Sequence, residues 1–192
     1  MLDKKMEQAL NDQLNAEMQS GYLYLSMATY FEDNDLPGFG NSLRVHAEEE
    51  LEHAMRFYDY ILRKGGSVVL QAIDEPKREW KDTVEVYEEI QAHEELVTSL
   101  IHDLVDLSIE LKDHATNQFL LWFVEEQVEE EELAAEDLRK VRMAVDAPQL
   151  LYLLDKEYGE FTGEEEDEEA SVIFYNNMFL FYFYFNFFNY SF

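Results

Sequence analysis

Four long segments of this chain have the spacing of amphipathic helices, and each carries polar side chains where core residues are expected. Apolar residues recur three or four positions apart, which is the pattern of a buried helical stripe. The stripes run from Leu10 to Phe31, from Leu43 to Ile61, from Tyr87 to Leu104 and from Thr116 to Ala134. Glutamates interrupt the first three stripes at Glu17, Glu50 and Glu94, and the fourth contains Gln127 and Glu130. This pattern predicts four packed helices with polar side chains at their centre.

Buried carboxylates need a charge partner. A carboxylate left alone in an apolar core costs several kcal/mol or becomes protonated. Glu17, Glu50, Glu94 and Glu130 occupy matching places in the four stripes, so they indicate one shared partner. Two divalent cations would balance four carboxylates. The sequence therefore predicts a dimetal site inside a four-helix bundle.

The charge balance narrows the classes of partner. The chain has 14 Lys and Arg against 43 Asp and Glu, a formal net charge of −29. A protein that binds nucleic acid needs a basic surface, so we expect no nucleic-acid partner. Such acidity fits either attraction of cations or adaptation to high salt, and the sequence leaves both open. The absence of cysteine excludes disulfides, zinc–thiolate sites, iron–sulfur clusters and thiol nucleophiles.

The N-terminal residues continue directly into a helical pattern without the apolar region of a secretory signal. We therefore expect a cytoplasmic protein.

The spacing predicts an all-α fold with five helices. We expect them over residues 3–33, 39–64, 83–111, 114–145 and, after Pro148, to about 158. The first two and the third and fourth are joined by short turns, so each pair forms an antiparallel hairpin. The link over residues 67–82, whose first half has strand-like character, is long enough to run the length of the bundle. A four-helix bundle with one long crossover is typical of ferritin-like folds.

The C-terminal part differs in composition. We divide the chain into a domain over 1–160, an acidic linker over 161–170 and an aromatic-rich tail over 171–192. The tail has no charged residue, more than half of it is Phe or Tyr, and Asn residues interrupt it. We interpret it as a non-native or disordered segment, translated from non-coding or frame-shifted DNA. A membrane-binding or partner-binding tail is the alternative, and the lack of a basic flank argues against a membrane anchor.

A Glu-x-x-His motif places a carboxylate and an imidazole on one helix face. Glu50 and His53 are three residues apart, and Glu50 lies on the buried stripe. Oxygen ligands with one imidazole suit iron or manganese. Di-iron bundles use a glutamate from each of two helices and two Glu-x-x-His pairs. In this chain Gln127-x-x-Glu130 stands in place of the second pair.

Several motifs together resemble the non-haem ferritins of bacteria and archaea over residues 3–160. They are Leu14-Asn15-Ala16-Glu17, Tyr22-Leu23-Tyr24-Leu25, His46-Ala47-Glu48-Glu49-Glu50, Glu52-His53-Ala54, Phe123-Val124-Glu125-Glu126-Gln127 and Leu154-Asp155-Lys156-Glu157. The resemblance implies a ferroxidase site of Glu17, Tyr24, Glu50, His53, Glu94, Gln127 and Glu130. Glu50 would bridge two irons. Glu17 and His53 would hold the first iron, and Glu94 and Glu130 the second. Gln127 would orient oxygen, and Tyr24 would donate a hydrogen bond or an electron.

The resemblance also implies a third iron position near the site. Its candidates are Glu49, Glu126, Glu129 and Glu130. The alternative for this dense acidic segment is a solvated helix face. His46 and His93 flank the stripes, and we interpret them as supporting or interface residues. Bacterioferritins bind haem through a methionine directly after the bridging glutamate, and because Leu51 stands there we expect no haem.

The function that the resemblance implies is iron storage. Fe(II) would be oxidised to Fe(III) by O₂ or peroxide and deposited as ferric oxyhydroxide inside a homo-oligomeric cage of 24 subunits. The first alternative is a rubrerythrin-like di-iron peroxidase, which the missing second Glu-x-x-His and the missing cysteines disfavour. The other alternative is a non-catalytic acidic scaffold or a DNA-coating mini-ferritin, whose site lies between subunits.

Overall fold

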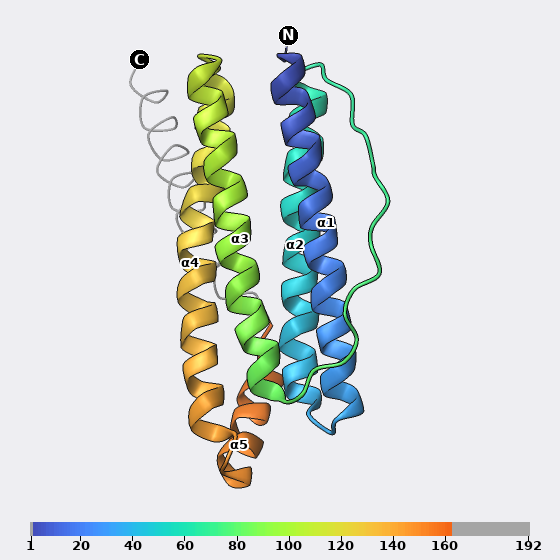
Figure 1. The fold of residues 1–192 in the computed structure, drawn as a ribbon, viewed down its shortest axis with the longest axis vertical. Helices are drawn as coiled ribbons and strands as arrows, with labels where there is room; N and C mark the ends of the chain where they lie inside the picture. Colours follow the sequence, from blue (N-terminus) through green and yellow to red (C-terminus); the bar gives the residue numbers. More distant parts are fainter. Residues whose placement is uncertain (1, 163–192) are drawn as a thin grey trace, which may run out of the picture. The chain divides into compact units, whose positions relative to one another are not determined.

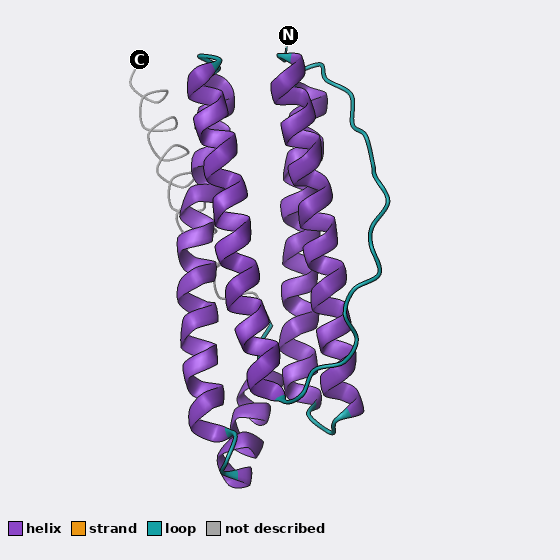
Figure 2. Ribbon diagram, viewed as in Figure 1, coloured by secondary structure: helices purple, strands orange, loops and turns teal. Residues whose placement is uncertain are grey.

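The computed structural model of the protein describes residues 2–162. Residues up to Phe161 form one compact unit built of five helices (Figure 1). The helices are α1 (Lys4–Asp33), α2 (Pro37–Arg63), α3 (Thr83–Glu110), α4 (His114–Ala144) and α5 (Pro148–Gly159). The described residues contain no strand (Figure 2), and none of their helices is long and apolar enough to cross a membrane. The expectations for the acidic linker beyond residue 162 and for the aromatic tail lie outside the described residues.

The topology agrees with the sequence prediction. Helices α1 and α2 form one antiparallel pair, α3 and α4 form the other, and α5 lies at one end of the bundle (Figure 1). The connection between α2 and α3 runs along α1 from one end of the bundle to the other, which makes α2 and α3 parallel. The all-α bundle with one long crossover and a short fifth helix is confirmed.

Side chains of α1 hold the crossover in an extended conformation. The side-chain oxygens of three α1 residues accept hydrogen bonds from backbone N–H groups of the crossover. The pairs are Asn11 with Val69 at 2.6 Å, Asn15 with Gln71 at 2.7 Å and Gln19 with Asp74 at 2.8 Å. Four helical residues advance about 6 Å and two extended residues advance nearly the same distance, so the first two pairs match. The strand-like composition thus corresponds to an extended segment paired with amides rather than with a strand.

The predicted stripes form the core. Every stripe residue named above is buried except Glu130, which is partly exposed. The buried apolar side chains divide into two clusters, one containing Phe31 and Tyr87 and the other containing Leu14 and Phe123. Along each of the four long helices the polar stripe residue separates the two clusters in sequence. The bundle therefore has a polar layer between two apolar ones.

Helix α5 caps the start of α2. Helices α1, α3 and α4 begin after aspartates that accept hydrogen bonds from first-turn N–H groups, but α2 follows Leu36 and has no such cap of its own. Asp155 Oδ1 accepts instead from the N–H groups of Gly38 at 2.8 Å and Phe39 at 3.2 Å. Tyr158 also packs edge-on against Phe39, with 4.9 Å between ring centroids. A carboxylate at a helix N-terminus satisfies free donors and the helix dipole.

We expect Asp155→Ala to lower the free energy of unfolding by about 1–3 kcal/mol, because two buried N–H groups lose a charged acceptor. Glu157→Ala is the matched control, since that carboxylate forms only a largely exposed ion pair with Lys140 and should change stability little. Urea unfolding followed by circular dichroism measures both variants. Equal losses in the two variants would contradict the capping role of Asp155.

Candidate metal centre

The polar layer brings together side chains from all four long helices. Glu17 comes from α1, Glu50 and His53 from α2, Glu94 from α3 and Gln127 from α4, and each is at most 6% exposed. One ligand atom each of Glu17, Glu50 and His53 lies within 4.8 Å of the others. The structure thus places these three predicted ligands close enough to bind one metal ion.

The geometry of this group leaves two carboxylate oxygens without a hydrogen bond from any described residue. Glu17 Oε1 accepts a hydrogen bond from Gln13 Nε2 at 2.9 Å. The second oxygens of Glu17 and of Glu50 are buried and have no hydrogen-bond partner among the described residues. Burial and the neighbouring charge of Glu50 raise the pKa of Glu17 well above its usual value. Because a cation would satisfy both oxygens at once, the donor set fits a hard divalent metal.

His53 is held by carboxylates on both ring nitrogens. Its Nδ1 lies 3.6 Å from Glu50 Oε2 and its Nε2 lies 3.5 Å from Glu126 Oε1. Burial disfavours the charged imidazole, but Glu126 and Glu50 stabilise it and raise the pKa of His53 to about 11. In the absence of metal a protonated His53 therefore supplies part of the positive charge that the carboxylates need. A metal ion would replace that proton.

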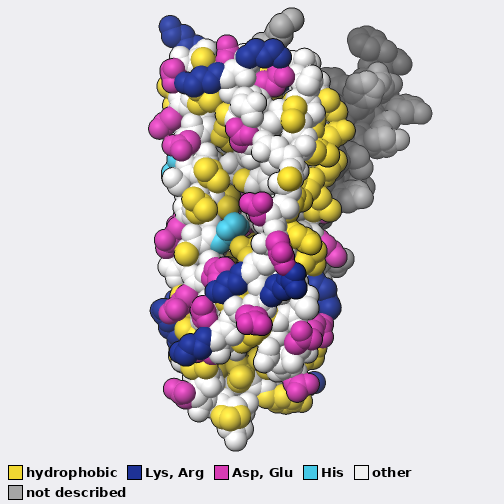
Figure 3. All heavy atoms as spheres, turned by 45° about the vertical axis from the view of Figure 1, so that its right-hand side comes forward, with side chains coloured by type: hydrophobic (Ala, Val, Ile, Leu, Met, Phe, Trp, Pro, Cys, Tyr) yellow, Lys and Arg dark blue, Asp and Glu magenta, His cyan; other side chains and the backbone are white. Residues whose placement is uncertain are grey.

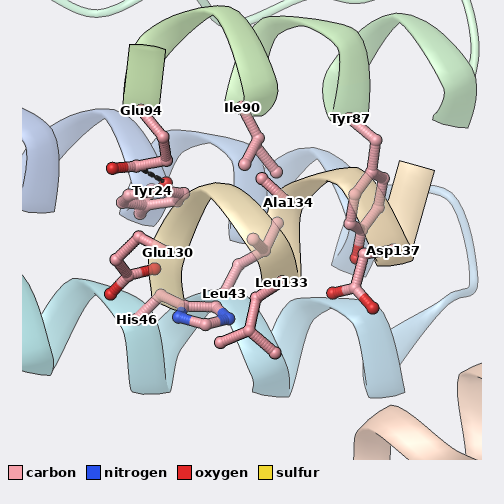
Figure 4. A pocket seen from close by; sticks show the side chains of 10 residues that line it. All are labelled: Tyr24, Leu43, His46, Tyr87, Ile90, Glu94, Glu130, Leu133, Ala134 and Asp137. Carbon is pink, nitrogen blue, oxygen red and sulfur yellow. Dashed lines mark hydrogen bonds between the residues drawn. The ribbon is translucent and has the colours of Figure 1, made fainter. Parts of the chain in front are cut away.

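Glu94 lies on the α3 side and is held by two other predicted site residues, of which Figure 4 shows Tyr24. The hydroxyl of Tyr24 donates a hydrogen bond to the Glu94 carboxylate, and Gln127 Nε2 donates to Glu94 Oε2 at 3.3 Å. Tyr24 and Gln127 therefore position the carboxylate of Glu94. Burial, with the charge of Glu94 as a further cause, raises the pKa of Glu130 to about 7.

Two further groups of possible ligands adjoin the first. His53, Glu126 and Glu130 form one, and His46, Glu49 and Glu130 form the other. Three of the four residues expected for a third position are thus in ligand groups. Glu129 is exposed and belongs to neither group within the described range.

Two contributors to the site were missed in the sequence. His46 was assigned no ligand role, but its Nδ1 lies 2.9 Å from Glu49 Oε2, which raises the pKa of His46 to about 9 although burial opposes it. Gln13 was not considered at all. Both lie four residues before a stripe glutamate, His46 before Glu50 and Gln13 before Glu17, so helical spacing was the signal that could have found them.

A four-helix bundle with a long crossover and a buried centre of glutamate, histidine and glutamine defines the class of ferritin-like proteins. The family profile described as the ferritin-like domain matches residues 7–144. The chain therefore belongs to the ferritin family.

Relatives and solved structures agree with this assignment. The chain is 39% identical over 160 residues to a bacterial non-heme ferritin of Bacteroides fragilis, covering 83% of this chain and 99% of the relative. It is 38% identical over 159 residues to a probable bacterial non-heme ferritin-like protein of Haemophilus influenzae, covering 83% and 96%. An open-pore ferritin of the archaeon Archaeoglobus fulgidus superposes with a TM-score of 0.83 at 44% identity, covering 84% and 99%.

Proposed function

We propose that this protein is a non-haem ferritin that oxidises Fe(II) inside each subunit and stores the product as ferric oxyhydroxide. The observation that carries the proposal is the convergence of Glu17, Glu50 and His53 in an apolar interior, with two carboxylate oxygens unpartnered among the described residues. Bacterial relatives that carry the name non-heme ferritin support it.

Each predicted residue has a role in this proposal. Glu17 and His53 hold one ferrous ion, and Glu50 bridges it to a second. Glu94 and Glu130 hold the second ion, which requires Glu94 to exchange its hydrogen bonds from Tyr24 and Gln127 for a bond to metal. Carboxylate oxygens are hard ligands, so they stabilise the ferric product more strongly than the ferrous substrate. Oxidation is favoured at the site for that reason.

We assign a third iron position to the partly buried acids beside the centre. Glu49, Glu126 and Glu130 lie in groups that each contain a histidine, and Glu129 borders them as an exposed residue. These side chains would receive Fe(III) as it leaves the two-iron site. The competing interpretation, a solvated acidic face, fits Glu129 better than the other three.

The surface supports assembly into a homo-oligomer. Large apolar side chains are at least 41% exposed on α1, on α2 and on the crossover, namely Tyr22, Leu25, Leu51, Met55, Leu62, Val69, Leu70 and Ile73. Figure 3 shows apolar and acidic side chains interspersed on the face that it presents. Burial of these exposed apolar side chains against another subunit would be favourable. We propose the 24-subunit cage that the resemblance implies, and the cytoplasmic location stays a prediction.

Aerobic loading with Fe(II), followed by size-exclusion chromatography and iron determination, tests storage. We expect a large particle that retains far more than two irons per chain, because oxyhydroxide accumulates in an enclosed interior. Anaerobic loading is the control and should leave only iron bound at the subunit sites. A small oligomer with two irons per chain would overturn storage and favour a rubrerythrin-like peroxidase.

A further inference from the structure

A small cavity, part of it open to solvent and with room for about one or two water molecules, extends from the metal centre toward the α5 end of the bundle (Figure 4). Tyr24, Glu94, Glu130 and His46 lie at one end of it, and Tyr87 and Asp137 lie at the other. Glu130 and Asp137 are two turns apart on α4, or about 10 Å. The cavity therefore joins the proposed iron ligands to a second group of polar side chains.

The second group has polar atoms that no described residue satisfies. Tyr87 is 2% exposed and Tyr158 is 6% exposed, and neither hydroxyl has a hydrogen-bond partner among the described residues. The two rings stack with 6.3 Å between centroids, and in Figure 4 the Tyr87 hydroxyl points toward Asp137. Buried hydroxyls of this kind are usually satisfied by ordered water when the site is polar and roomy enough.

Asp137 is the titratable group at this end of the cavity. Burial raises its pKa, and the positive charge of Lys140 opposes that rise. The other groups that act on Asp137 are His46 and Glu136. Lys140 Nζ lies 3.8 Å from Asp137 Oδ1 but closer to the solvent-facing carboxylates of Glu136 and Glu157, at 3.2 and 3.3 Å.

We propose that this cavity is a proton route, in which Asp137, assisted by the hydroxyl of Tyr87 and by water held in the cavity, carries protons from the iron site to solvent. The proposal rests on the proposed ferroxidase function. The carboxylate form of such a group accepts a proton delivered by water inside the cavity, and its protonated form returns the proton to solvent water. Apolar side chains, among them Leu43 and Ile90, line the cavity between its two ends.

The reaction needs such a route because it releases many protons. Four Fe²⁺, one O₂ and six H₂O give four FeOOH and eight H⁺, with four electrons passing from iron to O₂. Metal binding also displaces protons, since His53 and the raised-pKa glutamates must lose theirs to become ligands. These protons are released in a layer that lies between two apolar clusters.

The test compares Asp137→Asn with Glu132→Gln, which removes the same charge from an exposed position on α4. Stopped-flow mixing with a pH indicator follows proton release in the assembled protein after addition of Zn²⁺ alone and after Fe(II) with O₂. We expect Asp137→Asn to slow proton release about ten-fold in both arms, with unchanged Zn²⁺ stoichiometry. Formate, a small proton carrier, should restore the rate. Glu132→Gln should match the wild type.

Tyr87→Phe keeps the ring and removes the hydroxyl, and we expect it to slow release in the same direction. Wild-type release in Asp137→Asn overturns the route. Slow release that formate does not restore, together with an unaffected Tyr87→Phe variant, also overturns it and assigns Asp137 a structural role. If the wild type releases protons when Zn²⁺ binds but does not oxidise Fe(II), the ferroxidase proposal fails. The Zn²⁺ experiment still decides whether protons use this path.

Discussion

Replacing Glu50 with alanine is expected to abolish rapid Fe(II) oxidation, with a loss of at least about a hundred-fold in the initial rate. Glu50 is the proposed bridge between the two irons, and its carboxylate lies within 4.8 Å of ligand atoms of Glu17 and His53. Without it, neither iron has its full set of carboxylates, and the charge that favours Fe(III) is reduced. A missing ligand affects every turnover, and removal of even the groups that orient metal ligands costs about 10–100-fold.

Stopped-flow absorbance after mixing with Fe(II) and O₂ measures this rate. Glu48→Ala is the matched control, because Glu48 is an exposed acid two residues away on the same helix. The fold should survive in Glu50→Ala, since the substitution removes a buried carboxylate that raises the free energy of the metal-free protein. Oxidation at the wild-type rate in Glu50→Ala would refute the assignment of the site.

Metal-free protein is expected to lose several kcal/mol of stability as the pH rises from about 5 to about 9. The pKa of Glu17, Glu50 and Glu130 is raised in the folded chain, so the unfolded chain binds fewer protons above its normal glutamate pKa of 4.5. Stability therefore falls with increasing pH. The pKa values of His46 and His53 are also raised, to about 9 and about 11, and they change stability in the same direction. The stabilisation by the protonated histidines is complete below pH 6.5 and is lost as the pH rises above it.

The size of this effect follows from the shifts. Since one pKa unit corresponds to about 1.4 kcal/mol, the rise of Glu130 from 4.5 to about 7 accounts for at most about 3 kcal/mol. Urea unfolding at several pH values in the presence of a chelator measures the slope. Glu17→Gln should flatten it, and Zn²⁺ should oppose it, because metal replaces the protons. Stability that increases over this range would contradict the buried, protonated state of the site.

The sequence carried enough information for the bundle and for the centre of the site. Period and polarity are local properties, so the stripes predicted which faces are buried, and the interruptions at Glu17, Glu50 and Glu94 predicted where polar side chains meet. Glu130 is the stripe residue that stays partly exposed. Its place on the stripe predicted complete burial, whereas in the structure it is shared between two ligand groups at the edge of the polar layer.

Features that depend on long-range contacts were not predictable. The capping of α2 by Asp155 joins residues 117 positions apart in the chain, and no local signal marks it. Helical spacing could have predicted the pairing of Glu49 with His46. The third member of their group, Glu130, comes from another helix, so spacing along one helix could not reveal it. The unpartnered hydroxyls of Tyr87 and Tyr158 appear only when α3 and α5 are packed together.

The side-chain amides of α1 that bind the crossover fix the number of residues that the crossover can have between its anchor points. Asn11, Asn15 and Gln19 are three anchor points on a rigid helix. The number of crossover residues between two anchors must therefore match the distance between them along α1. An inserted residue between Val69 and Gln71 would leave one anchor without its N–H donor, although the segment has no regular secondary structure. Tolerance to insertion therefore follows the spacing of these anchors rather than the loop-like appearance of the segment.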